Sequence, residues 1–233
     1  MIEDLDFETY LYISKDKFQI FVLNKKKLKN LYSQELKIDH QFDFKDLNKL
    51  LNFLDKNIYK IEKLIGNFIK NIILIVENEK NLKINMGIKK NYETLLKQKS
   101  FSSNLTELKD LFKKNYQDQT IMHMCIINYI IDGKRYSSFD TKLINDYFCI
   151  EVSFIAIDNK LVFAFDNVLE KYQIKIKQYM CGNYINNFIG DTGDEISIIA
   201  NKLRNGLNIN EITIVPKHKE NKGFFEKFFQ LFS

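Results

Sequence analysis

The sequence has no apolar run long enough to cross a membrane. Its longest uninterrupted apolar stretch, Ile72–Val76, is far shorter than the roughly 20 residues that a spanning helix requires. The first residues, Met1–Asp6, are acidic, whereas a secretory signal peptide begins with basic residues. Both observations predict a protein that is made and remains in the cytoplasm.

Proline and cysteine are also scarce. With 233 residues, of which 45% are hydrophobic and only one is proline, the chain can bury a core as one compact body or two small subdomains. Cys125, Cys149 and Cys181 are odd in number, widely spaced and in apolar surroundings, so we expect reduced buried thiols rather than disulfides or zinc ligands. The formal net charge of +5 is modest and does not favour a nucleic-acid partner.

Motifs of the common catalytic classes are missing from the sequence. It contains no G-x-S-x-G, P-loop, H-E-x-x-H or paired C-x-x-C motif. His123 lies in an apolar run, where a hydrogen-bonded structural histidine is the expected role. His40 and His218 lie in polar segments with no cluster of cysteines or carboxylates at ligand spacing. We therefore predict that the protein is not an enzyme and holds no catalytic residue, metal or cofactor.

The first half of the chain alternates between strand and helix patterns. β-rich or alternating runs predict strands at 9–13, 18–23, 31–38, 72–76 and 82–86. Between Asp46 and Phe68, apolar residues recur at helical spacing and predict the longest helix of the body. This helix is expected to cover one face of the sheet that these strands form.

The second half predicts a further small unit of helices and strands. A helix begins near Ser103, and strands are expected at 120–132, 149–158 and 173–179, with a helix at 160–171. A closing helix is expected from Asp194 to about Asn208, followed by a strand at 211–215 that could rejoin the first sheet.

These elements predict an α+β fold of two small mixed subdomains. The expected divisions are a first subdomain at 1–99, a second at 100–187, a closing helix and strand at 188–216, a basic linker at 217–222 and an amphipathic helix at 223–233.

The C-terminal helix predicted at 223–233 has a phenylalanine-rich face. At about 100° per residue its apolar side chains fall within an arc of roughly 160°, opposite Glu226, Lys227, Gln230 and Ser233. Such a helix can dock on its own domain, enter a groove on a partner or lie in a membrane interface. The lysines beside it favour an anionic membrane surface. The predicted membrane-binding residues are Lys222, Phe224, Phe225, Lys227, Phe228, Phe229, Leu231 and Phe232.

Three runs in the second half of the chain, Ile121–Gly133, Cys149–Ile157 and Val168–Ile176, carry a resemblance to a known family. That family is FtsA, the bacterial cell-division member of the actin-like ATPase superfamily. Ile121–Gly133 resembles the family's "ilHvip.Y.vDg" strand, which opens the subdomain (lettered 1C) that FtsA inserts into its first domain. Cys149–Ile157 resembles its "leV.vhii" strand, and Val168–Ile176 the helix-to-strand passage that follows. The phenylalanine-rich end resembles the membrane-targeting tail of FtsA. Residues 9–90 resemble the first half of domain 1A in the order of elements only.

The sequence also departs from FtsA where the family binds nucleotide. The family's first hairpin carries a D-[IV]-G-[TS]-x-K phosphate turn, but the equivalent turn here, Ser14–Lys17, has no glycine to let the backbone approach a phosphate. No second glycine-rich loop follows, and little sequence remains after residue 216 for the other two domains. Gly190–Asp194 is expected to be a turn with Asp194 as helix N-cap, or else a degenerate phosphate or metal loop.

The resemblance implies an FtsA-like protein without the ATPase. We expect a non-enzymatic cell-division scaffold, peripheral on the inner face of the cell membrane. Its expected partners are the anionic membrane surface, further copies of itself and division proteins, with FtsZ left open and nucleic acid excluded. The alternative is a PilM-like component of a pilus or secretion platform that binds a membrane protein's cytoplasmic peptide. The predicted partner-binding loop contains Lys134, Arg135, Tyr136 and Phe139.

Overall fold

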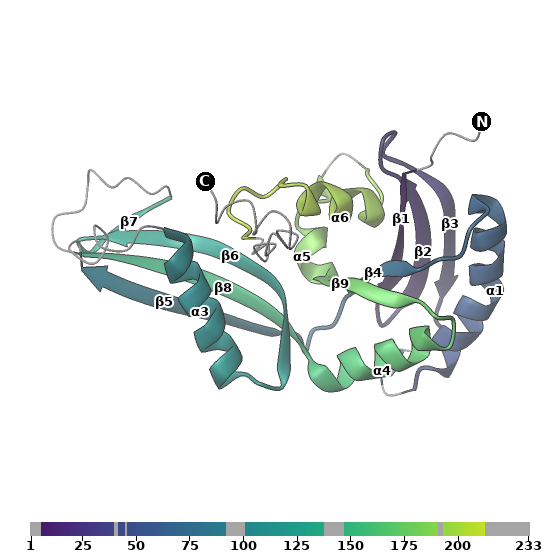
Figure 1. Ribbon diagram of the computed structural model, residues 1–233, viewed down its shortest axis with the longest axis horizontal. Coiled ribbons are helices and arrows are strands. Elements are labelled where there is room, and N and C mark those ends of the chain that lie inside the picture. Colours follow the sequence, from purple (N-terminus) through teal and green to yellow (C-terminus); the bar gives the residue numbers. More distant parts are fainter. Residues whose placement is uncertain are drawn as a thin grey trace, which may run out of the picture.

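The computed structural model describes residues 6–39, 42–44, 46–91, 101–137, 147–190 and 193–212. The described chain forms two β-sheets that lie end to end, each with its own hydrophobic core (Figure 1). The fold is therefore a mixed α+β fold with two sheets, as predicted.

The first sheet has five strands in the order β3-β2-β1-β4-β9. Its strands are β1 (Phe7–Ile13), β2 (Lys17–Asn24), β3 (Lys29–Lys37), β4 (Asn71–Val76) and β9 (Lys175–Cys181). The first three strands form an antiparallel meander, and β4 lies parallel to both β1 and β9. β1 and β4 are almost wholly buried because helices cover both faces of the sheet.

Two pairs of helices cover the first sheet. These are α1 (Asn48–Ile65) and α4 (Asn159–Glu170) on one face, and α5 (Gly182–Asn186) and α6 (Ile196–Arg204) on the other (Figure 1). A chain of aromatic contacts links Phe18 of β2 through Phe42 and Phe44 to Phe165 of α4. α1 ends before Phe68, earlier than predicted, because Gly66 adopts a left-handed φ of 68° and stops the helix.

The second sheet has four antiparallel strands in the order β5-β8-β6-β7. They are β5 (Leu82–Asn91), β8 (Tyr147–Asp158), β6 (Gln119–Ile131) and β7 (Lys134–Tyr136), and helix α3 (Phe101–Asn115) packs on one face. Alternate residues of β5 and β8 point to this helix. Half-buried and exposed residues therefore alternate regularly along β5.

Two strands change sheets relative to the sequence prediction. Residues 82–86 were expected beside the first unit and 173–179 beside the second, but β5 pairs with β8 and β9 pairs with β4. Periodicity identifies a strand and its buried face, but it does not identify the partner strand. The second sheet is thus inserted in the sequence between β4 and β9.

The closing segment also differs from its prediction. The N-cap of α6 is Glu195 and not Asp194, and the helix ends at Arg204. The Asp194 carboxylate instead forms an ion pair with Lys202 at 2.6 Å. Glu211 bridges to Cys125 on β6, so this segment joins the edge of the second sheet and not the first. The linker at 217–222 and the helix predicted at 223–233 lie outside the described residues.

Candidate functional site

The hairpin turn between β1 and β2 stands where the family resemblance places a phosphate loop. The Ser14 hydroxyl accepts hydrogen bonds from the amides of Asp16 at 3.2 Å and Lys17 at 3.1 Å. The Ser14 amide donates to the Lys17 carbonyl at 3.0 Å. The Lys15 ammonium forms an ion pair with Glu79 at 2.8 Å. The turn's own groups therefore occupy the donors that a phosphate would need.

Glu77 and Gly182 pack tightly beside this turn, next to an open pocket of about 200 Å³ that Tyr12, Lys17 and Asn186 help to line. Glu77, which follows β4, accepts hydrogen bonds from the Tyr12 hydroxyl at 2.6 Å and the Asn186 amide at 2.7 Å. A Cβ atom added at Gly182 would lie 2.8 Å from the Glu77 Cβ and 3.1 Å from its Cα, so only glycine fits there. The carboxyl end of β1 is tightly packed.

A buried polar cluster joins the two sheets and the segment that leads to the C-terminus. We call it the junction cluster, and it consists of His123, Cys125, Cys181, Tyr184, Asn208 and Glu211. The Cys181 amide donates to His123 Nε2 at 2.8 Å, so His123 Nδ1 carries the proton and donates to Glu211 at 2.7 Å. The side chain of His123 is fully buried. Both ring nitrogens have partners, as expected for a structural histidine.

Tyr184 completes the junction cluster from helix α5. Its hydroxyl donates to Glu211 at 2.8 Å and accepts from the Asn208 amide at 2.8 Å, and the Cys125 thiol lies 3.6 Å away. Burial raises the pKa of the Tyr184 hydroxyl and that of the Cys125 thiol. Both groups are therefore held in their neutral forms near pH 7, and their hydrogen bonds tie helix α5 to the segment at 208–211.

The junction cluster fixes the point where the C-terminal residues leave the described body. The Ile126 amide donates to the Asn210 carbonyl at 2.9 Å, and the Ile212 amide donates to the Met124 carbonyl at 2.8 Å. With the Glu211 side chain bound on the same short segment, the chain is attached to β6 where the two sheets meet.

The predicted partner-binding loop is a short strand in its described part. Lys134 and Arg135 are exposed in β7, and Arg135 lies 3.9 Å from Glu151. Tyr136 is half-buried and packs against the second core. Phe139 lies outside the described residues, as do all eight predicted membrane-binding residues, which begin at Lys222.

Other expectations concern cysteines, metals and membrane spans. All three cysteines are free thiols, but Cys149 is half-buried rather than buried, because it points away from α3. Within the described ranges, no three His, Cys, Asp or Glu side chains come together as a metal site. No helix in the same ranges is long and apolar enough to cross a bilayer.

Sequence reasoning missed two groups of residues. Glu211 and Tyr184 are 88 and 61 positions from His123, by subtraction of their residue numbers, and no local pattern connects them. The sequence also offers no indication that Lys25, Lys70 and Lys177 lie close together around the amino end of β4, because their proximity depends on how the strands pair. The apolar run around His123 was the one available signal.

Comparison with known proteins gives a distant structural likeness only. No protein family and no curated protein sequence matches the chain. Three similar solved structures are the cytoplasmic domain of EpsL, an inner-membrane component of the type II secretion system of Vibrio cholerae, a PilM-PilN type IV pilus biogenesis complex, and a Bacteroides thetaiotaomicron protein with an actin-like ATPase fold and unknown function.

Sequence identity and structural similarity to these three structures are both low. Identity is 8% for EpsL, 7% for PilM-PilN and 16% for the Bacteroides protein, with TM-scores of 0.38, 0.46 and 0.31. The matches cover 76%, 78% and 81% of this chain but 57%, 49% and 58% of the others, so the chain spans about half their length. None of the three is an FtsA protein, and likeness of this degree establishes no function.

Proposed function

We propose that the protein is a non-enzymatic adaptor, held at a membrane by its C-terminal residues, that binds a partner protein there. The observation that carries the proposal is the apolar arc of five phenylalanines and Leu231 between Gly223 and Ser233, opposite a charged face. An amphipathic helix of this kind with neighbouring lysines is typical of segments that lie in the interface of anionic membranes.

The expected strength of this attachment is modest. Half-burying six large apolar side chains gives on the order of 10 kcal/mol at about 25 cal/mol per Å². Ordering a short helix that is marginal in water removes much of this. One copy should therefore bind weakly and reversibly, and several copies held together should bind firmly.

The junction cluster supports the proposal by giving the attachment a fixed origin. Asn210–Ile212 is bonded to β6 through backbone and side-chain contacts. The ten residues from 213 to 222 can span at most about 35 Å when fully extended. A membrane-bound helix would therefore keep the place where the two sheets meet close to the bilayer surface.

The hairpin turn supports the non-enzymatic part of the proposal. Nucleotide-binding loops present free backbone amides to phosphate, whereas the amides of Asp16 and Lys17 are bound by Ser14. The buried thiol and hydroxyl of the junction cluster are likewise neutral and hydrogen-bonded.

Two cellular settings fit such an adaptor. The division setting rests on the FtsA resemblance and has no support from the three similar structures. Two of those structures come from a type II secretion system and a type IV pilus system. Purification of the tagged full chain with its native membranes, followed by mass spectrometry, separates the two settings. Enrichment of pilus or secretion membrane proteins supports the second setting, and enrichment of division proteins supports the first.

Self-association belongs to the same proposal, because several weak tails in one assembly bind a surface firmly. The exposed Lys134 and Arg135 of β7 are the candidate contact. Changing both to Glu should lower the density of protein on vesicles without altering the circular dichroism spectrum. Tyr136 is left unchanged, because it packs on the second core and its loss would disturb the fold. Unchanged density would exclude this strand as the contact.

Membrane attachment is tested by co-sedimentation of the full chain with anionic vesicles. Phe225→Asp with Phe229→Asp places two charges in the acyl boundary and should release the protein into the supernatant. Gln230→Ala on the opposite face is the matched control and should still sediment. Sedimentation of the double variant at the wild-type level would show that the apolar arc does not bind the membrane.

A further inference from the structure

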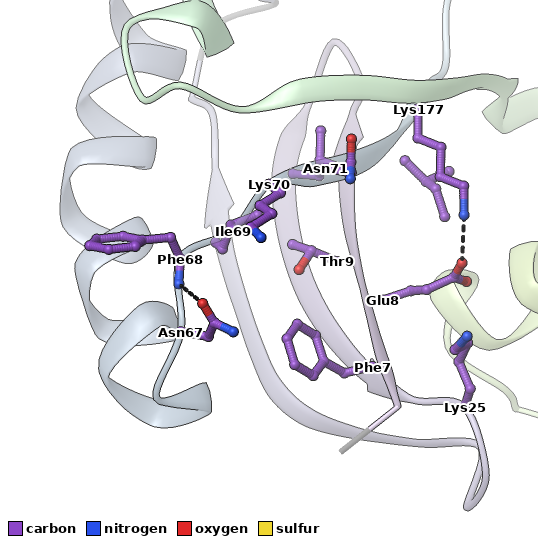
Figure 2. A pocket seen from close by; sticks show the side chains of 12 residues that line it. Phe7, Glu8, Thr9, Lys25, Asn67, Phe68, Ile69, Lys70, Asn71 and Lys177 are labelled. Carbon is purple, nitrogen blue, oxygen red and sulfur yellow. Dashed lines mark hydrogen bonds and ion pairs between the residues drawn. The ribbon is translucent and has the colours of Figure 1, made fainter. Parts of the chain in front are cut away.

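Strands β1 and β4 separate at the end of the first sheet opposite the hairpin turn. Their pairing begins at Tyr10 and Ile73, so Phe7–Thr9 pair only with β2, and Asn71 and Ile72 pair only with β9. The gap forms an open pocket of about 450 Å³, which we call the basic pocket (Figure 2). Its volume lies in the range of roughly 300 to 1,000 Å³ that is usual for ligand sites.

Positive charge exceeds negative charge in the basic pocket. Lys25, Lys70 and Lys177 line it together with a single carboxylate, Glu8. Counted over the described residues, the excess is two positive charges, and it is unchanged when the outer partners are included, because Asp6 pairs with Lys25 and Arg204 with Glu8. Figure 2 shows the three lysines arranged around Thr9.

One oxygen of Glu8, Oε2, has partners other than the pocket lysines, and the other, Oε1, faces Lys177. Oε2 accepts hydrogen bonds from the Tyr10 hydroxyl at 2.8 Å and from the Arg204 guanidinium. Lys177 lies farther away, at 3.6 Å, and its side chain is 55% exposed whereas that of Glu8 is 13% exposed. The Lys177 ammonium can therefore bind another anion while Glu8 Oε2 keeps its bonds to Tyr10 and Arg204.

A β-bulge directs Lys177 to this place. Ile72 pairs with Ile176 and Ile73 with Gln178, so Lys177 is an extra residue with no partner on β4. Bulges bend a strand and re-aim a side chain, and they occur often beside functional sites. In Figure 2 the side chain of Lys177 extends into the pocket toward Glu8.

Lys70 supplies a further cation, and among the described residues no carboxylate pairs with it. Among the described residues its ammonium forms no ion pair or hydrogen bond, although it lies directly before β4. The Asn71 amide and Thr9 hydroxyl add neutral polar groups to the same lining. The pocket is therefore rich in donors and poor in free acceptors.

We propose that the basic pocket binds a phosphate monoester. Such a group carries about 1.5 to 2 negative charges at pH 7 and three acceptor oxygens, which match the excess of two positive charges and the lysine donors. The site lies at the opposite end of the sheet from the turn where the family resemblance places a phosphate. The phosphate can come from a soluble metabolite or from a lipid headgroup.

The soluble source is tested by isothermal titration of the full chain with glycerol 1-phosphate. Saturable binding is expected, and Lys177→Gln and Lys70→Gln should each weaken it about tenfold, as for loss of a charge-assisted hydrogen bond. Lys160→Gln, at an exposed lysine on α4 away from the pocket, is the matched control and should bind as wild type. Circular dichroism confirms that each variant is folded.

The lipid source is tested with vesicles of phosphatidylcholine containing phosphatidic acid, a phosphate monoester lipid. The full chain carrying Phe225→Asp and Phe229→Asp is used, so that the tail does not contribute. Binding that is lost in Lys177→Gln supports a lipid headgroup. The proposal is overturned if neither probe binds, or if the control variant weakens binding as much as the pocket variants do. These tests of the basic pocket do not depend on whether the C-terminal residues bind vesicles in the co-sedimentation experiment.

Discussion

The two ends of the first sheet use their hydrogen-bond donors in opposite ways. At the hairpin end, Ser14 binds the turn amides and Glu79 binds Lys15. At the other end, β1 and β4 separate, and the ammonium groups of Lys70 and Lys177 border an open pocket. The contrast indicates that anion binding should occur where the lysine ammonium groups border open space, not at the position that the family resemblance implies.

The largest expected difference between the two ends is in stability. Glu8→Ala leaves the Arg204 guanidinium, which is 15% exposed, without its carboxylate. Breaking a buried ion pair costs about 3 to 5 kcal/mol, and we expect about 3 kcal/mol because both groups retain some solvent contact. Urea denaturation measures the change.

Glu79→Ala at the hairpin end is the matched comparison. The Lys15–Glu79 pair is exposed, with side chains 42% and 76% accessible, so its loss should change the unfolding free energy by less than about 0.5 kcal/mol. Equal effects of the two substitutions would contradict the view that only the pocket end contains a buried ion pair.

A second prediction concerns acid stability. Burial raises the pKa of Glu8, but the hydrogen bonds from Tyr10 and Arg204 outweigh it and hold the pKa below its ordinary value of 4.5. A carboxylate with a lowered folded-state pKa stabilises the protein above its unfolded pKa, and this stabilisation is lost as pH falls through the folded value.

Wild type should therefore lose more unfolding free energy than Glu8→Gln when the pH is lowered from about 5 to about 3. Denaturation curves at matched pH values measure this difference. Parallel curves for the two proteins would show that Glu8 does not contribute.

The third prediction addresses the closed turn directly. Ser14→Ala removes the acceptor for the amides of Asp16 and Lys17 and should lower the unfolding free energy by about 1 kcal/mol, as for loss of a capping side chain. Ser33→Ala, on an exposed position of β3, is the control and should stay within about 0.5 kcal/mol. A neutral Ser14→Ala would mean that the turn does not depend on its hydroxyl.

The sequence predicts the elements of this fold better than their partners. The runs at 9–13, 18–23 and 72–76 become β1, β2 and β4 because buried strands are rich in β-branched and aromatic residues. No local sequence pattern shows that β5 belongs to the second sheet and β9 to the first. Pairing depends on how distant segments pack, and the crossover through α4 decides where β9 returns.

The candidate sites show the same limit. The missing glycine at Ser14–Lys17 can be seen in the sequence itself, since a single residue decides how close the backbone can approach a phosphate. Lys177 has no such signature. Its position results from a bulge that exists only once β9 pairs with β4, and Lys25 reaches the same pocket from the far end of β2.

The smallest expected effect is on nucleotide binding at the hairpin end, where we predict none. ATP carries phosphates that the basic pocket could also bind, so the measurement uses the full chain with both Lys70→Gln and Lys177→Gln. With ATP and magnesium this variant should show no shift in unfolding temperature, because the amides of Asp16 and Lys17 already have acceptors. Wild type serves as the reference, and any shift it shows should vanish in the variant. A shift that persists, equivalent to micromolar affinity by linkage, would show that the hairpin end still binds phosphate and that the two ends do not differ in the way proposed.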